Sequence, residues 1–77
     1  MSKILYRNME EAQGVVINTS RGDEKWNAVD YYERWGRRFF LMEHSEYGDE
    51  VPCIVLDDLG NVREWNWYDT LEEWVEA

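Results

Sequence analysis

The stretch RRFFLMEH, Arg37 to His44, contains four apolar residues in succession, Phe39 to Met42. Successive side chains of a β-strand point to opposite faces of a sheet, so an unbroken apolar run requires burial on both faces. A strand at the centre of a sheet meets this requirement. The sequence therefore predicts a sheet with this stretch at its centre, in a chain of 77 residues that has room for a single domain, residues 1–77.

A hairpin is predicted after this strand. VPCIVLDD (51–58) and VREWNW (62–67) are strand-like runs separated by a turn with Gly60, which can adopt a positive φ. Asp57 and Asp58 are interpreted as turn residues, because aspartate commonly hydrogen-bonds its own backbone in turns. KILYRN (3–8) and GVVINTS (14–20) are also predicted as strands. Connections this short favour antiparallel pairing.

The segment DEKWNAVDYYERW, residues 23–35, allows two interpretations. From Ala28 to Trp35 aromatic and small residues recur at i, i+3, i+4 and i+7, as one face of a helix requires, and Gly36 could end that helix. The alternative is a strand, because every second residue from Val29 to Trp35 also shares one face and RWGR can form a tight turn. We predict the helix.

The C-terminal stretch DTLEEWVEA predicts another helix, with Asp69 as its N-cap or, alternatively, a capping box from Thr70 to Glu73. One face of it carries Leu71, Trp74 and Val75, and the opposite face carries Asp69, Glu72, Glu73 and Glu76. The predicted fold class is α+β: a small antiparallel sheet of four to five strands with a C-terminal helix and a second helix at about 23–35.

Negative charge is concentrated in the second half of the chain. Residues 1–42 hold seven Lys/Arg and six Asp/Glu, a net charge of +1, whereas residues 43–77 hold eleven Asp/Glu and only Arg63, a net charge of −10. Such asymmetry is informative about partners rather than about fold. We predict that the eleven acids form a partner-binding surface: Glu43, Glu46, Asp49, Glu50, Asp57, Asp58, Glu64, Asp69, Glu72, Glu73 and Glu76.

The residues that catalysis requires are scarce. His44 is the only histidine and Cys53 the only cysteine, and nothing near them in the sequence completes a catalytic triad. We interpret Cys53 as a core residue and His44 as a surface residue. A structural zinc site needs four Cys/His-type ligands, and this chain has only two, His44 and Cys53. The sequence also contains neither a calcium-loop pattern nor a glycine-rich phosphate loop. We therefore expect no enzymatic activity, no metal and no other cofactor.

The aromatic residues Trp65, Trp67 and Tyr68 resemble the base-stacking platforms of proteins that bind single-stranded nucleic acid. Those platforms lie in positively charged grooves, whereas this chain has a net charge of −9, so we expect no direct binding to nucleic acid. Trp65, Trp67 and Trp74 are instead interpreted as core residues, because a small domain needs large side chains to close its core. A basic cluster is expected to pair with acids of this or a neighbouring chain: Arg34, Arg37 and Arg38.

Cysteine content and hydropathy favour a cytoplasmic protein that is not bound to a membrane. A single cysteine cannot form an internal disulfide, and no run approaches the roughly 20 apolar residues that a membrane-spanning helix needs. The N-terminal sequence MSKILYRNMEE also lacks the apolar core of a signal peptide.

Two functions fit these features. The first is a small acidic inhibitor that binds a basic nucleic-acid-binding protein by imitating the charge of DNA or RNA, because such proteins gain much of their affinity by neutralising phosphates. By analogy, phages and mobile elements use small acidic proteins against restriction or CRISPR machinery. The second is an interaction module that binds another protein, or a second copy of itself in a homodimer, through exposed aromatic side chains.

Overall fold

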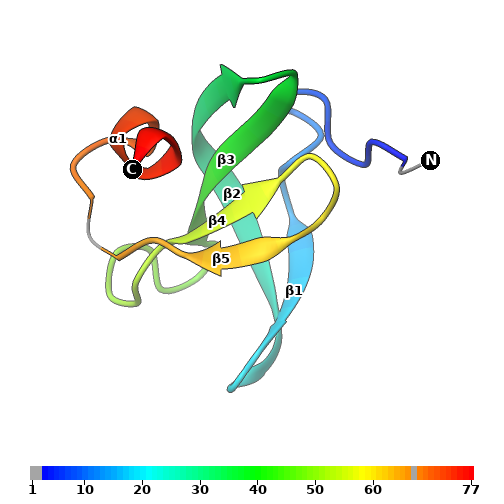
Figure 1. Ribbon diagram of the computed structural model, residues 1–77. Coiled ribbons are helices and arrows are strands. Elements are labelled where there is room, and N and C mark those ends of the chain that lie inside the picture. The colour runs from blue at the N-terminus through cyan, green and yellow to red at the C-terminus, as the bar shows by residue number, and fades with distance from the viewer. Residues whose placement is uncertain (1–2, 67) are drawn as a thin grey trace.

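The computed structural model describes residues 3–66 and 68–77, which form a curled antiparallel sheet of five strands and one short helix (Figure 1). The strands are adjacent in space in the same order as in the sequence. The elements are β1 (Val15–Thr19), β2 (Gly22–Arg34), β3 (Arg37–His44), β4 (Ile54–Asp57), β5 (Val62–Glu64) and α1 (Leu71–Glu76). The α+β class, the central position of β3 and the β4–β5 hairpin are confirmed.

The helix predicted at 23–35 is wrong, because residues 23–34 belong to β2 and Trp35 lies in the turn that follows it. A β-bulge explains the misleading pattern. The register between β2 and β3 shifts between Ala28 and Asp30, which leaves Val29 as an extra residue. Ala28 pairs with Met42 and Tyr31 pairs with Phe40, so residues three positions apart point to the same face of the sheet. A spacing of three imitates helical periodicity although the backbone is extended.

A two-residue turn joins β2 to β3, as the alternative interpretation of RWGR required. Arg34 pairs with Arg37 across the turn, and Trp35 and Gly36 between them have φ values of 55° and 70°. Positive φ at both central residues identifies a type I′ turn, which suits the twist of a hairpin. Glycine adopts this conformation readily, whereas tryptophan does so only under strain. The side chain of Trp35 is 67% exposed.

Residues 3–8, predicted as a strand, do not form one. The amides of Leu5 and Tyr6 both donate to the carbonyl oxygen of Asp58, at 2.7 and 3.3 Å. An antiparallel ladder instead alternates its donors and acceptors between the two chains, so this shared acceptor does not begin a strand pair. The chain then turns, and the amide of Ala28 donates to the carbonyl oxygen of Ala12 at 3.0 Å. The N-terminal segment therefore covers the sheet instead of joining it.

Both faces of the central strand are covered, as its apolar run requires. Phe40 and Met42 point to one face, where they pack with Trp26 and the fully buried Ala12 of the N-terminal segment. Phe39 and Leu41 point to the other face, which is covered by α1 (Figure 1). The second cluster contains Val55, Trp65, Leu71 and Val75. The C-terminal helix thus closes the core of a sheet that is itself too small to bury both faces.

The N-cap of α1 is Thr70, as the alternative prediction required, and the assignment of Asp69 is wrong; of the two bonds of the predicted capping box, the one from Thr70 Oγ1 is found. Thr70 Oγ1 accepts a hydrogen bond from the amide of Glu73 at 3.1 Å. Leu71 and Val75 are buried, whereas Trp74 is half-buried and its Nε1 donates to the carbonyl oxygen of Glu64 at 2.8 Å. This hydrogen bond ties the helix to the end of β5. Trp67, also predicted in the core, lies outside the described residues.

Candidate functional site

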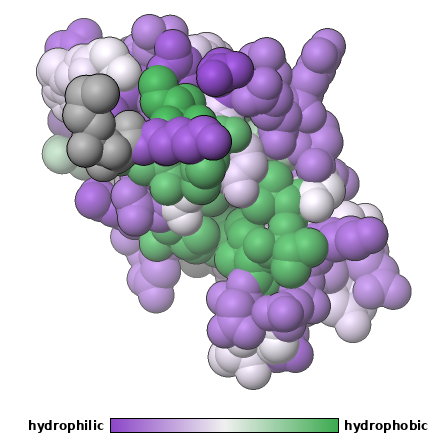
Figure 2. Space-filling model, turned by 90° about the vertical axis from the view of Figure 1, so that its right-hand side faces the viewer, coloured by the Kyte–Doolittle hydropathy of each residue, from purple (hydrophilic) through white to green (hydrophobic). Residues whose placement is uncertain are grey.

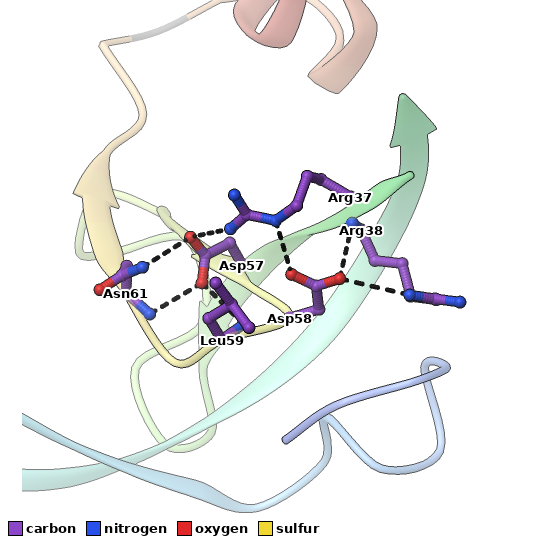
Figure 3. A network of polar contacts seen from close by, with 6 residues as sticks. All are labelled: Arg37, Arg38, Asp57, Asp58, Leu59 and Asn61. Carbon is purple, nitrogen blue, oxygen red and sulfur yellow. Dashed lines mark hydrogen bonds and ion pairs between the residues drawn. The ribbon is translucent and has the colours of Figure 1, made fainter. Parts of the chain in front are cut away.

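Asp57 and Asp58 form a buried polar network with the start of β3 (Figure 3). Arg37 Nη2 donates to Asp57 Oδ2 at 2.9 Å, and Arg37 Nε donates to Asp58 Oδ1 at 3.0 Å. Arg38 reaches the other oxygen of Asp58 with its backbone amide at 3.2 Å and with Nη1 at 3.3 Å. The hydrogen bond from Arg37 to Asp58 is the largest cause of the raised pKa of Arg37. The network fixes the β4–β5 turn against the beginning of the central strand.

The same network confirms two interpretations and corrects one. Asp57 Oδ1 accepts from the amides of Leu59 and Asn61 at 2.9 and 2.8 Å, so Asp57 is a turn residue. Pairing of the basic cluster with acids of its own chain is confirmed at Arg37 and Arg38 in this network, and at Arg34 by an ion pair with Glu76. However, both aspartates are buried, so they do not belong to an exposed acidic face.

Glu76 also has partners within the chain. Its Oε2 accepts from the hydroxyl of Tyr32 at 2.7 Å, and its Oε1 lies 3.4 Å from Arg34 Nη2. The hydrogen bond to Glu76, followed by burial, raises the pKa of Tyr32. These contacts hold the last turn of α1 against β2. Glu76 therefore contributes to helix docking, and only part of its charge is available to a partner.

The other eight predicted acids make no ion pair among residues 3–66 and 68–77. We call them the acidic surface: Glu43, Glu46, Asp49, Glu50, Glu64, Asp69, Glu72 and Glu73. Glu43 is half-buried and the other seven are exposed. They come from the end of β3, the β3–β4 loop, the end of β5 and the beginning of the C-terminal segment with α1; the loop, the end of β5 and α1 all lie towards the left in Figure 1. Glu72 and Glu73 occupy the first turn of α1, where the helix dipole favours negative charge.

His44 is buried, with 4% of its surface exposed, so its prediction as a surface residue is wrong. Its Nδ1 accepts hydrogen bonds from the amides of Glu46 and Tyr47, both at 3.0 Å. A nitrogen that accepts carries no proton, so the proton of the neutral ring lies on Nε2, which is 3.0 Å from Glu24 Oε2. Glu24 also accepts from Arg21, which is the main reason that its pKa is lowered to about 2. The histidine anchors the start of the β3–β4 loop.

Cys53 lies at the edge of the second core cluster and is half-buried. Burial raises the pKa of its thiol, and the negative charges of Glu43 and Asp49 add to this effect. A raised thiol pKa reduces the amount of nucleophilic thiolate at neutral pH. The side chain also lines a cavity with Trp65, which is 8% exposed. The interpretation of Trp65 as a core residue is thus confirmed, whereas the cavity beside it was not predicted.

Trp35 is a second surface feature that sequence analysis missed. Its ring is solvent-exposed at the tip of the β2–β3 hairpin, and the guanidinium of Arg34 lies 5.1 Å from the ring centroid. The dipeptide WG was the available signal, because a two-residue hairpin turn made of Trp35 and Gly36 places Trp35 at the tip. Interpretation of this segment as a helix concealed that signal.

Exposed apolar side chains also occur near the two edge strands. Figure 2 shows apolar groups within a largely hydrophilic surface on the side of the molecule that carries the N-terminal segment and β1. The exposed apolar residues of these elements and of β5 are Ile4, Leu5, Val16 and Val62.

Within the described residues, no group of three or more His, Cys, Asp or Glu side chains is arranged to hold a metal ion. No helix in this part of the chain is long and apolar enough to cross a membrane.

These features define a small acidic α+β domain with a curled five-stranded sheet. Its sequence matches the family described as Large polyvalent protein-associated domain 18 (LPD18) over residues 8–76. The chain belongs to this family, whose description associates the domain with large polyvalent proteins. Comparison with curated proteins and with solved structures gives no match.

Proposed function

We propose that this domain is a non-catalytic module whose acidic surface binds a basic nucleic-acid-binding protein where that protein binds nucleic acid. The family's association with large polyvalent proteins supports a role beside, or within, a larger protein assembly. The role resembles that of a phage-type inhibitor of restriction or CRISPR proteins, and its target is then a positively charged nucleic-acid groove.

The observation that carries this proposal is the unequal distribution of counter-ions. Arg37 and Arg38 are already paired with the buried Asp57 and Asp58. The eight carboxylates of the acidic surface have no such partner in the part of the chain that the structure describes. Clustered exposed charges of one sign repel each other, and a surface of opposite charge relieves that repulsion. A basic groove is therefore the kind of partner that the surface favours.

The experiment is capture from the native host, followed by competition with the captured protein's DNA or RNA. Glu72→Lys with Glu73→Lys reverses two exposed charges and leaves the contacts of Glu76 intact. Loss of capture in this variant supports the proposal. The matched control is Glu10→Lys with Asp23→Lys, which changes the net charge equally at exposed positions outside the acidic surface. Binding should be retained in the control.

Salt and nucleic acid provide two further readouts. Binding between exposed charges should weaken as salt rises, because the screening length is about 8 Å at physiological ionic strength. The partner's nucleic acid should compete with the domain for one site. Binding that is insensitive to salt and to the reversed charges, or a partner without a basic groove, would exclude charge imitation.

Trp35 supports a second candidate, an interaction module that binds through exposed aromatic side chains. Tryptophan is enriched among residues that dominate binding energy at protein interfaces. At this position it combines an exposed ring with a backbone conformation that costs free energy, and burial within the domain does not offset that cost. In this candidate the acids serve solubility, and removal of the Trp35 ring abolishes binding.

A further inference from the structure

A cavity of about 250 Å³ lies where β4 begins and β5 ends. Ile54 and Glu64 are paired across these two strands, so their side chains stand beside each other on one face of the hairpin. Trp65, which follows Glu64, is buried against the core and forms a fixed wall. Among the residues that the structure describes, the lining is Pro52, Cys53, Ile54, Glu64, Trp65 and Asn66.

The lining combines apolar walls with negative charge. Glu64 is the only charged residue in it, and its side chain makes no ion pair among the described residues. Two more carboxylates, those of Glu43 and Asp49, are close enough to Cys53 to influence its thiol electrostatically. A cavity of this kind is complementary to a side chain with a long apolar stem and a positive end.

We propose that this cavity receives a lysine side chain from a basic segment of the partner protein, with the methylenes against Ile54 and Trp65 and the ammonium group at Glu64. Lysine fits because its ammonium is a compact charge on a flexible stem of four carbons. The proposal rests on the proposed function, since it assigns one specific contact within the acidic surface. It also gives the cavity a function that the charge of the surface alone does not explain.

Cys53 provides a direct test, because it lines the cavity and is the only cysteine in the chain. The rate at which N-ethylmaleimide modifies Cys53 is measured by mass spectrometry, with and without hexalysine. Binding of hexalysine is measured separately by calorimetry. A lysine stem in the cavity covers the thiol, so hexalysine should slow the modification in proportion to its occupancy.

A hexamer of 2,4-diaminobutyrate is the control ligand, because each side chain is two methylenes shorter and still positively charged. It can approach the carboxylates but cannot fill the cavity. A buried methylene contributes roughly fourfold in affinity, so the lysine that enters the cavity should gain up to about fifteenfold over the shorter side chain. The shorter ligand should leave the rate of Cys53 modification unchanged or raise it, since a nearby cation favours the thiolate.

Glu64→Gln tests the position of the ammonium group. The variant keeps the backbone carbonyl that accepts the Trp74 hydrogen bond, so the helix should stay in place. The hexalysine concentration that protects Cys53 should rise about twofold to fivefold, as expected for loss of one exposed ion pair. Glu10→Gln is the matched control, because it removes the same charge at an exposed position far from the cavity in the sequence. In this control variant, hexalysine should protect Cys53 from modification at the same concentration as in the wild type.

The outcomes separate the two proposals. If hexalysine binds in a salt-dependent way but leaves Cys53 modification unchanged, the lysine site is excluded while the acidic surface stands. Equal protection by the short-stem hexamer, or protection that Glu64→Gln does not weaken, also excludes the site. If hexalysine does not bind at all, the acidic surface is excluded together with the site.

Discussion

Arg37 Nε donates a 3.0 Å hydrogen bond to Oδ1 of Asp58, whose side chain is 1% exposed. The two residues are 21 positions apart in the sequence, and the contact joins the start of the central strand to the β4–β5 turn. Negative charge in the second half of the chain is therefore of two kinds. Asp57 and Asp58 pair with arginines inside the fold, whereas the eight carboxylates of the acidic surface make no ion pair in the described part of the chain.

The first prediction concerns Asp58. Replacing Asp58 with alanine should lower the free energy of unfolding by about 2 to 4 kcal/mol, because it leaves two arginines without their shared carboxylate. The value is below that for a fully buried pair, since Arg37 and Arg38 are partly exposed. Urea denaturation followed by tryptophan fluorescence measures the change. Asp49→Ala is the control and should change stability by no more than about 0.5 kcal/mol, because Asp49 is exposed.

The second prediction concerns Trp74, which packs on Phe39 and donates to the carbonyl oxygen of Glu64. Trp74→Ala should lower the free energy of unfolding by about 2 to 3 kcal/mol, less than the loss for a fully buried tryptophan, because the ring is half-buried. Trp74→Phe keeps a ring on Phe39 but removes the donor, so about 1 kcal/mol should be lost. Equal losses in both variants would show that the hydrogen bond, and not ring packing, dominates.

The third prediction concerns pH and Glu24. Its pKa is about 2 in the folded protein and its ordinary value is 4.5, because Arg21, Thr19 and His44 all stabilise the carboxylate. A lowered pKa stabilises the fold above pH 4.5, and this contribution is lost as the pH falls from 4.5 towards 2. Urea denaturation of wild type and Glu24→Gln at several pH values isolates the effect. The stability difference between them should shrink over this range, whereas Glu10→Gln should follow the wild type throughout.

The sheet could be predicted from local patterns only where the pattern reports burial directly. Phe39 to Met42 identified the central strand because all four residues are apolar. Such a run has to be buried on both faces, and this conclusion does not depend on knowing which strands lie beside it. In β2 the bulge at Val29 determines which residues point inward, and no local sequence pattern predicts that bulge. The prediction failed there because a bulge changes the spacing of inward residues from two to three.

The candidate surface was only partly predictable, because pairing of charges depends on distant contacts. Arg37 and Asp57 are 20 positions apart in the sequence, and no local pattern shows that they meet. His44 was expected at the surface because of its acidic neighbours. Its burial depends on the amides of Glu46 and Tyr47, which satisfy Nδ1 only after the β3–β4 loop has folded back.

The fourth prediction concerns Trp35 and separates the two candidate functions. Trp35→Asn should raise the free energy of unfolding by about 0.5 to 1 kcal/mol, because Asn-Gly is a preferred pair for a type I′ turn. Loss of the contact with Arg34 offsets part of this gain, since an exposed cation–π interaction contributes about 0.5 kcal/mol. Trp35→Ala removes the same ring but keeps a residue that tolerates positive φ poorly, so it should give no gain. Urea denaturation measures both variants.

Binding by the same two variants then identifies the surface in use. If the acidic surface binds the partner, Trp35→Asn should be more stable and bind as the wild type does, and its binding should remain sensitive to salt. If Trp35 is the anchor, both variants should lose binding although one of them is more stable. That combination would show that the strained turn is kept for the exposed ring, because stability alone favours asparagine at this position. Lower stability in Trp35→Asn would contradict the assignment of strain to Trp35.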